Sequence, residues 1–261
     1  MTMYKKFRLP LLLTFVAGFL LIVFTSTPDD VLPVSGGGGG SVGMIILDAG
    51  HGGADPGCVG INGALEKDIN LKIVKALENM LSFSGYDVLL TRSEDISLHD
   101  VGISGLRNQK VSDMENRKKI IDDNPDSIFL SIHQNQFTQP QIFGAQMFYV
   151  DNNADSARLA LALQNNFKEL EPDNTREIKL IDNGLFLFKN TTQPAVLIEC
   201  GFLSNPNDAA NLNDREYQKR VAFTIYKSVI QHLSNSRETT QPEETQKTNE
   251  IIEVLYMQER E

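Results

Sequence analysis

Four residues of the 261-residue chain could together form a hydrolytic site. His51 lies three residues past the apolar stretch "MIILD", His133 ends the stretch "SIFLSIH", and Glu199 ends the stretch "AVLIE". Glu66 begins the helical stretch "EKDINLKIVKALENMLSFSG". Two imidazoles, one carboxylate and a water are typical ligands of a catalytic zinc ion, and a second carboxylate can act as its general base. We therefore predict His51, Glu66 and His133 as ligands of one Zn²⁺, and Glu199 as the catalytic base.

Each of these residues also has a structural explanation. A histidine at the end of a strand is often only hydrogen-bonded, Glu66 could favour the N-terminus of a helix, and Glu199 could pair with an arginine. These explanations weaken for the set as a whole, because a buried glutamate that ends "PAVLIE" is costly unless a cation compensates it. The other two histidines, His99 and His232, are expected to be solvated or to cap a helix. The motif HExxH of many zinc peptidases is absent from the sequence.

The elements expected around these residues would bring them together. Short apolar runs rich in β-branched or aromatic residues predict strands at 44–48, 86–90, 127–133, 145–150, 185–188 and 195–200. Helical periods fall at 66–85, 156–170 and 214–233, and the first has Leu71, Val74, Leu77 and Leu81 on one face. This alternation predicts an α/β fold: a single domain with a mostly parallel, six-stranded twisted sheet flanked by helices. The carboxyl ends of parallel strands share one edge of such a sheet, where ligands bind.

Three further residues are candidates for substrate binding. Arg92 comes two residues after the predicted strand 86–90, and Arg117 opens a short helix in "NRKKIID". A structural salt bridge is the alternative role for either arginine, and we give it more weight. Asn135, in "SIHQN", is the third candidate. Most of residues 93–117 has no clear period and is expected to run irregularly over the surface.

The two ends of the chain differ from the domain predicted at 44–233. Residues 1–24 carry three positive charges and then an uncharged apolar run, which predicts an export signal, kept as a membrane anchor. Residues 25–43 are rich in Gly, Ser and Pro and should form a flexible linker. The segment at 234–261 is polar and acidic and should be disordered. A core of this size needs no disulfide, so the only two cysteines, Cys58 and Cys200, are expected to be partly buried thiols. The formal net charge of −10 argues against nonspecific binding to nucleic acid.

Successive motifs of the chain resemble those of one enzyme family. "ILDAGHGGADPGCVG", the Glu of "LEKDINL", "LTR", "SIHQN" and "AVLIECGFLSNPNDAANL" are similar, in this order, to the zinc-dependent N-acetylmuramoyl-L-alanine amidases of type 3. The resemblance covers about Met44 to Leu233. It places the family's metal ligands on His51, Glu66 and His133 and its catalytic glutamate on Glu199. It implies hydrolysis of the amide between the lactyl group of N-acetylmuramic acid and L-alanine in peptidoglycan.

The arrangement of the chain is most similar to one subtype. A single amidase domain on an N-terminal anchor, without a wall-binding module, resembles the CwlD-type amidases of endospore formers, which act with a deacetylase to make muramic-δ-lactam in spore cortex. The resemblance implies an exported enzyme outside the cytoplasmic membrane, between the forespore membranes in a spore former. Its partners would be peptidoglycan, the cytoplasmic membrane through the N-terminus, and a targeting or activating protein. Two alternatives remain open: a zinc hydrolase of another cell-wall amide, and a catalytically silent peptidoglycan-binding module.

Overall fold

The structure is a computed structural model, and it describes residues 43–151, 153–181 and 184–235. The predicted anchor at 1–24, all but Gly43 of the predicted linker, and the tail beyond residue 235 lie outside the described residues. Within the described part of the chain, no helix is both long enough and apolar enough to cross a membrane.

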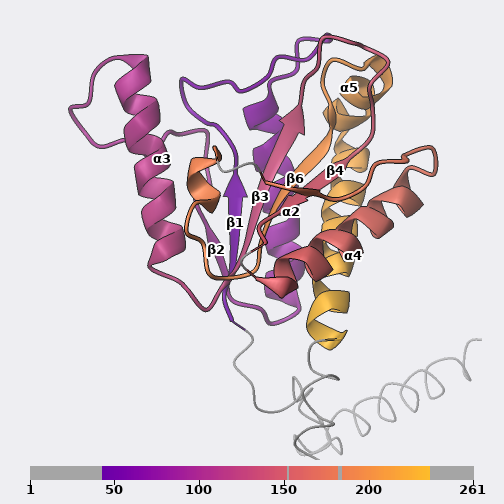
Figure 1. Cartoon of the computed structure of the whole chain (residues 1–261). Helices are drawn as coiled ribbons and strands as arrows, with labels where there is room; N and C mark the ends of the chain where they lie inside the picture. Colours follow the sequence, from indigo (N-terminus) through magenta and orange to yellow (C-terminus); the bar gives the residue numbers. More distant parts are fainter. Residues whose placement is uncertain (1–42, 152, 182–183, 236–261) are drawn as a thin grey trace, which may run out of the picture. The chain divides into compact units, whose positions relative to one another are not determined.

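One six-stranded sheet forms the centre of the fold (Figure 1). Its strands are β1 (Ile45–Ala49), β2 (Val88–Leu90), β3 (Ile128–Asn135), β4 (Gln146–Tyr149), β5 (Lys179–Leu180) and β6 (Ala195–Phe202). They lie in the order β2-β1-β3-β6-β4-β5. Strands β2, β1, β3 and β6 are parallel, β4 is antiparallel to β6, and β5 is parallel to β4. The predicted α/β fold with a mostly parallel six-stranded sheet is confirmed.

Helices cover both faces of the sheet. The labelled helices are α2 (Glu66–Phe83), α3 (Leu106–Asp122), α4 (Ala154–Leu170) and α5 (Pro206–Asn213), with a short 3₁₀ helix η2 (Phe186–Phe188) and a C-terminal helix at 215–235. The larger core joins α2, α4 and the C-terminal helix to one face of the sheet, and the smaller core joins α3 and η2 to the other face. Alternate residues of a strand therefore enter different cores: Leu130 and Ile132 belong to the larger core, and Phe129 to the smaller.

Helix α2 shows why the larger core is stable. Ile69, Ile73, Leu77 and Leu81 recur every four residues and are at most 1% exposed. Burial of each such side chain contributes about 1.5–3 kcal/mol. Leu71, predicted on the buried face, is only half-buried. This packing fixes the start of α2 at Glu66, beside the carboxyl ends of the strands.

The stretch "LFLF" was predicted as a strand, and this prediction is wrong. Residues 186–188 form η2, and the fifth strand of the sheet is Lys179–Leu180. Four consecutive apolar residues have no period that separates a strand from a helical turn. In η2, Leu187 and Phe188 are buried, with the ring of Phe188 5.2 Å from that of Phe129, while Phe186 remains 44% exposed.

The irregular excursion predicted at 93–117 is only partly correct. Residues 93–105 are irregular, but α3 already begins at Leu106, so Arg117 lies well inside a 17-residue helix and does not open one. Its buried residues are mostly polar, including Ser112, Asp113 and Arg117. The helix docks through hydrogen bonds as well as apolar contacts, and the sequence therefore lacks a clear apolar period.

Both cysteines are free thiols; Cys58 is partly buried, as expected, whereas Cys200 is fully buried.

Candidate metal and catalytic site

The predicted site residues meet at the carboxyl ends of β1, β3 and β6. His133 on β3 and Glu199 on β6 are direct partners across the parallel ladder, and His51 follows β1 by two residues. Glu66 comes from the first turn of α2. One ligand atom each from His51, Glu66 and His133 can be chosen so that all three lie within 4.8 Å of one another. Parallel strand topology thus brings together residues up to 148 positions apart, counted from His51 to Glu199.

Glu66 lies at the centre of the group and is 1% exposed. Its Oε1 lies 2.9 Å from Nδ1 of His133 and accepts a hydrogen bond from the backbone N–H of Gln134 at 3.0 Å. Its Oε2 lies 3.2 Å from Nε2 of His51 and accepts the backbone N–H of Cys58 at 2.7 Å. Burial would raise the pKa of Glu66, but His133 and His51 outweigh burial and hold it well below its usual range. Glu66 is therefore an ionised carboxylate placed between two imidazoles.

His51 is oriented from its other ring nitrogen. Its Nδ1 lies 2.9 Å from Oδ2 of Asp55, so Nε2 faces Glu66. A carboxylate behind a histidine is the usual second partner of a metal-binding imidazole. Burial lowers the pKa of His51, but Asp55 and Glu66 outweigh burial and raise it to about 9. The backbone φ of His51 is 63°, a rare conformation for a side-chain-bearing residue, and a hydrogen bond of 2.7 Å from Nη2 of Arg117 to its carbonyl oxygen supports it.

Two glycines leave room for these side chains. A Cβ on Gly50 would lie 2.2 Å from Cε1 and Nε2 of His133. A Cβ on Gly57, which has a φ of 68°, would lie 2.5 Å from Oε2 of Glu66. The glycine-rich loop therefore has a steric role, because any larger residue at these two positions would displace a predicted ligand.

Glu199 lies beside the group but is not bonded to it. Its Oε2 is buried and has no hydrogen-bond partner among the described residues. Burial is the main cause that raises the pKa of Glu199 to about 7; His133 acts in the opposite direction, and Glu66 adds to the increase. A carboxyl group with a pKa near neutrality can both accept and donate a proton at physiological pH.

The residues present fit a divalent metal ion. Two imidazoles and one carboxylate form the donor set of many catalytic zinc sites. Glu66 and Glu199 bring two carboxyl groups to the site, and Oε2 of Glu199 has no hydrogen-bond partner among the described residues, so a cation would compensate their negative charge. His51, Glu66 and His133 would hold the ion, and Glu199 would remain outside the ligand set.

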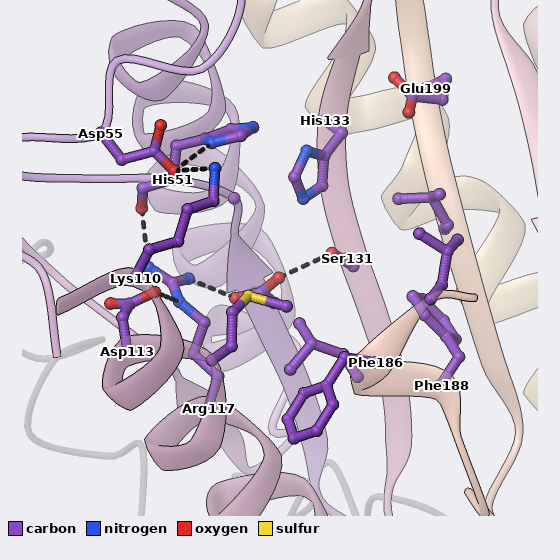
Figure 2. Close-up of a pocket in the computed structure, with 16 residues that line it drawn as sticks. His51, Asp55, Lys110, Asp113, Arg117, Ser131, His133, Phe186, Phe188 and Glu199 are labelled. Carbon is purple, nitrogen blue, oxygen red and sulfur yellow. Dashed lines mark hydrogen bonds and ion pairs between the residues drawn. The ribbon is translucent and has the colours of Figure 1, made fainter. Parts of the chain in front are cut away.

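A cavity of about 220 Å³ extends from the site across the face of the sheet (Figure 2). His51, His133 and Glu199 lie at one end of it. One wall is apolar and comes from Met114 of α3, Leu197 of β6 and residues 185–188 around η2. The other wall is charged and consists of Asp48, Asp55, Lys110, Asp113 and Arg117.

The guanidinium groups of both arginines point into the protein. Arg117 donates to Asp48 at 2.6 Å, to Asp113 at 2.8 Å and to backbone carbonyls of the glycine loop. Arg92 donates to the carbonyl oxygens of Ala49 and Gly50, and also to those of Glu94 and Lys67. Arg117 borders the cavity, whereas Arg92 does not. Both arginines hold the loop that carries His51.

Asn135 lies past His133 on β3, beyond an irregularity in the pairing with β6. It is half-buried, its Oδ1 accepts the backbone N–H of Gln136 at 2.8 Å, and it does not border the cavity.

The other two histidines lie apart from the metal group. His99 is half-buried, with Nδ1 2.9 Å from Oγ of Ser97. His232 was expected to be solvated or a cap, but it is only 6% exposed, and burial lowers its pKa. The helix that contains it continues to residue 235, two residues beyond its predicted end.

The sequence patterns did not single out Asp55 or Lys110. Asp55 orients His51, and Nζ of Lys110 lies 3.0 Å from the same Oδ2 of Asp55 (Figure 2). The only sequence signal for Asp55 was its position four residues after His51. Lys110 had none, because its segment was expected to be irregular.

Comparison with known proteins identifies the family. Residues 45–231 match the family Amidase_3, described as N-acetylmuramoyl-L-alanine amidase. The chain belongs to this amidase family. Its members hydrolyse peptidoglycan, so the chain is an N-acetylmuramoyl-L-alanine amidase, and this result favours the predicted enzyme over the silent binding module.

Several relatives of this amidase resemble it over most of their length. The germination-specific N-acetylmuramoyl-L-alanine amidase of Bacillus subtilis is 35% identical over 231 residues, which cover 85% of this chain and 94% of the relative. Among solved structures, the CwlD amidase of Clostridioides difficile, in complex with the GerS lipoprotein, has a TM-score of 0.71 and 40% identity. That match covers 74% of this chain and 98% of the other. The catalytic domain of CwlV from Bacillus (Paenibacillus) polymyxa has a TM-score of 0.63 and 29% identity, with 74% and 98% covered. The predicted resemblance to CwlD-type amidases is confirmed.

Proposed function

We propose that this amidase is zinc-dependent and that it cleaves the bond between the lactyl group of N-acetylmuramic acid and L-alanine during muramic-δ-lactam formation in spore cortex. The observation that carries the proposal is the convergence of His51, Glu66 and His133 beside Glu199, whose buried Oε2 has no hydrogen-bond partner in the part of the chain that the structure describes. The similarity to a germination-specific amidase and to a CwlD amidase supports the role in cortex.

Zinc, when bound, would polarise the lactyl carbonyl and acidify the attacking water. Glu199 accepts a proton from this water as its oxygen adds to the carbonyl carbon. Glu199 then donates the proton to the nitrogen of L-alanine as the C–N bond breaks. The products are a muramic acid residue with a free lactyl carboxylate and a peptide stem with a free amine. Asp55 holds His51 in the required orientation through both steps.

The three predicted substrate-binding residues have different roles in this proposal. Arg92 and Arg117 position the loop of His51, since their donors are occupied by backbone and carboxylate oxygens. Asn135 remains a proposed substrate contact, because it is half-buried just beyond His133 on β3.

The placement of the enzyme is also a proposal. We infer that residues 1–24 direct export and retain the chain at the outer side of the cytoplasmic membrane, which in a spore former is the space between the forespore membranes. A protein partner would assist targeting or activation. The support for such a partner is that the similar CwlD amidase was solved in complex with a lipoprotein.

Purified muropeptides test the reaction. The zinc-loaded full chain should release intact peptide stems, with mass spectrometry showing cleavage only at the lactyl-alanine amide. Release of acetate or cleavage within the stem would instead identify a hydrolase of another amide. The cortex role is tested in an endospore former that lacks its own amidase of this type: this chain should restore muramic-δ-lactam, whereas the Glu199→Gln variant should not.

A further inference from the structure

Lys110 lies on a wall shared by two cavities. It extends from α3 and borders the 220 Å³ cavity that Glu199 also borders. It also borders a second cavity of about 210 Å³, on the side of Ser97 and His99. Asp55 and Asp113 are shared in the same way. A substrate group that extends from the catalytic cavity toward the second one would pass the amine of Lys110.

The positive charge of Lys110 is available to a ligand. Its side chain is 57% exposed, and among the described residues its amine has one partner, Oδ2 of Asp55 at 3.0 Å. An ammonium group has three N–H donors, so two remain for a bound anion. Arg117 also borders the catalytic cavity, but its donors are directed to Asp48, Asp113 and backbone carbonyls.

The three aspartates that border the cavities are negative and already have partners. Asp48 and Asp113 accept hydrogen bonds from Arg117, and Asp55 is shared between His51 and Lys110. The whole chain carries a formal net charge of −10, which opposes the approach of an anionic group. A carboxylate near this site therefore needs a local cation, and Lys110 is placed to supply it.

We propose that Lys110 is a specificity-determining residue that binds a free carboxylate of the peptide stem while the lactyl amide lies beside Glu199. This inference rests on the proposed function. Substrate binding by Lys110 would also be connected to the metal site, because Lys110 and His51 contact the same oxygen of Asp55. Only Asp55 would then separate a stem carboxylate bound by Lys110 from His51, a predicted metal ligand.

Two muropeptides test the proposal. They have the same glycan and stem length, but one has free stem carboxylates and in the other these are amidated. The zinc-loaded full chain should cleave the acidic substrate with the lower KM. Lys110→Met should raise KM for the acidic substrate roughly tenfold, the scale of one lost charge-assisted hydrogen bond, with kcat and zinc content retained. KM for the amidated substrate should stay constant.

Matched variants separate charge recognition from structure. Lys119→Met removes a cation from an exposed part of the same helix, where Lys119 pairs with Asp123, and should leave both KM values unchanged. Lys110→Arg should restore most of the preference for the acidic substrate.

Three results would overturn the proposal: no preference in the wild-type chain, an unchanged preference in Lys110→Met, or an equal loss on both substrates together with loss of zinc. The last would show that Lys110 acts only through Asp55 and His51. Failure of the wild-type chain to cleave the lactyl-alanine amide of either substrate would instead reject the proposed function itself, and the role of Lys110 with it.

Discussion

At the scale of single residues, Glu199 differs from the three predicted ligands because its Oε2 has no hydrogen-bond partner within residues 43–151, 153–181 and 184–235, and burial raises its pKa to about 7. Glu199→Gln keeps the shape of the side chain but cannot accept the proton of the attacking water. We expect the variant to bind zinc normally and to lose activity by at least about 10²-fold. Muropeptide turnover measured at a matched zinc content checks this. Near-normal turnover would assign the base to another residue.

The steric role of Gly50 gives a second prediction at this scale. Gly50→Ala would place a methyl group 2.2 Å from the imidazole of His133, so the ring must move. We expect a weaker zinc affinity, by roughly 10- to 100-fold, the scale seen when a metal ligand loses its orientation. Gly184→Ala is the control, because a Cβ there meets no atom of the described residues within 4 Å. Equal zinc affinity in the two variants, measured by competition with a chelator, would contradict the steric role.

At the scale of elements, the pair of Asp48 on β1 and Arg117 on α3 fastens the polar face of α3 to the sheet. Burial would raise the pKa of Asp48, but Arg117 is the main opposing cause, and the pKa falls from 3.8 to about 2. Because the folded-state pKa is below the unfolded-state value, this stabilisation is present above about pH 4 and is lost as the pH falls toward 2.

Asp48→Asn should therefore destabilise the fold at pH 7 by about 2–3 kcal/mol, the scale of this pKa shift, since it leaves the buried guanidinium of Arg117 with Asp113 as its remaining carboxylate partner. The difference from wild type should shrink as the pH falls from about 4 to 2. Urea unfolding at several pH values measures both effects. Asp123→Asn breaks only the exposed pair with Lys119 and should cost no more than about 1 kcal/mol. A constant difference across this pH range would show that Asp48 is not titrating as described.

How far the sequence predicted the structure also depends on the element. The strands that carry His133 and Glu199 and the helix that carries Glu66 have clear apolar patterns, so the meeting of these residues could be predicted from parallel topology. Helix α3 was mostly missed because its buried contacts are polar, and η2 was mistaken for a strand because "LFLF" has no diagnostic period. Lys110 and Phe186 lie on these two elements, so the walls of the cavity could not be predicted although its catalytic end could.

At the scale of the whole molecule, an enzyme that cleaves an insoluble polymer must be held near it. The predicted anchor at 1–24 and linker at 25–43 would do this. A flexible linker of the 19 residues at 25–43 would span roughly 25 Å, from about 5–6 Å times the square root of its length. An enzyme held in this way would reach only peptidoglycan close to the membrane.

We therefore predict that a chain starting at Met44 is folded and cleaves soluble muropeptides normally, but is weakly active on intact sacculi. Membrane fractionation should find the full chain retained outside the cytoplasm. The activities of both chains on muropeptides and on sacculi distinguish an effect of the tether from an effect on catalysis. If a released, soluble form modified cell wall as well as the full chain does, the tether would not explain substrate access.

Zinc content across a set of variants tests the central claim most directly. The purified wild-type chain and Glu199→Gln should each hold one zinc ion per chain, measured by elemental mass spectrometry, because Glu199 lies outside the ligand set. His51→Ala, Glu66→Ala and His133→Ala should each lose most of the ion while circular dichroism shows an intact fold, because the two apolar cores form independently of the metal. Full zinc retention in folded His133→Ala would contradict the account.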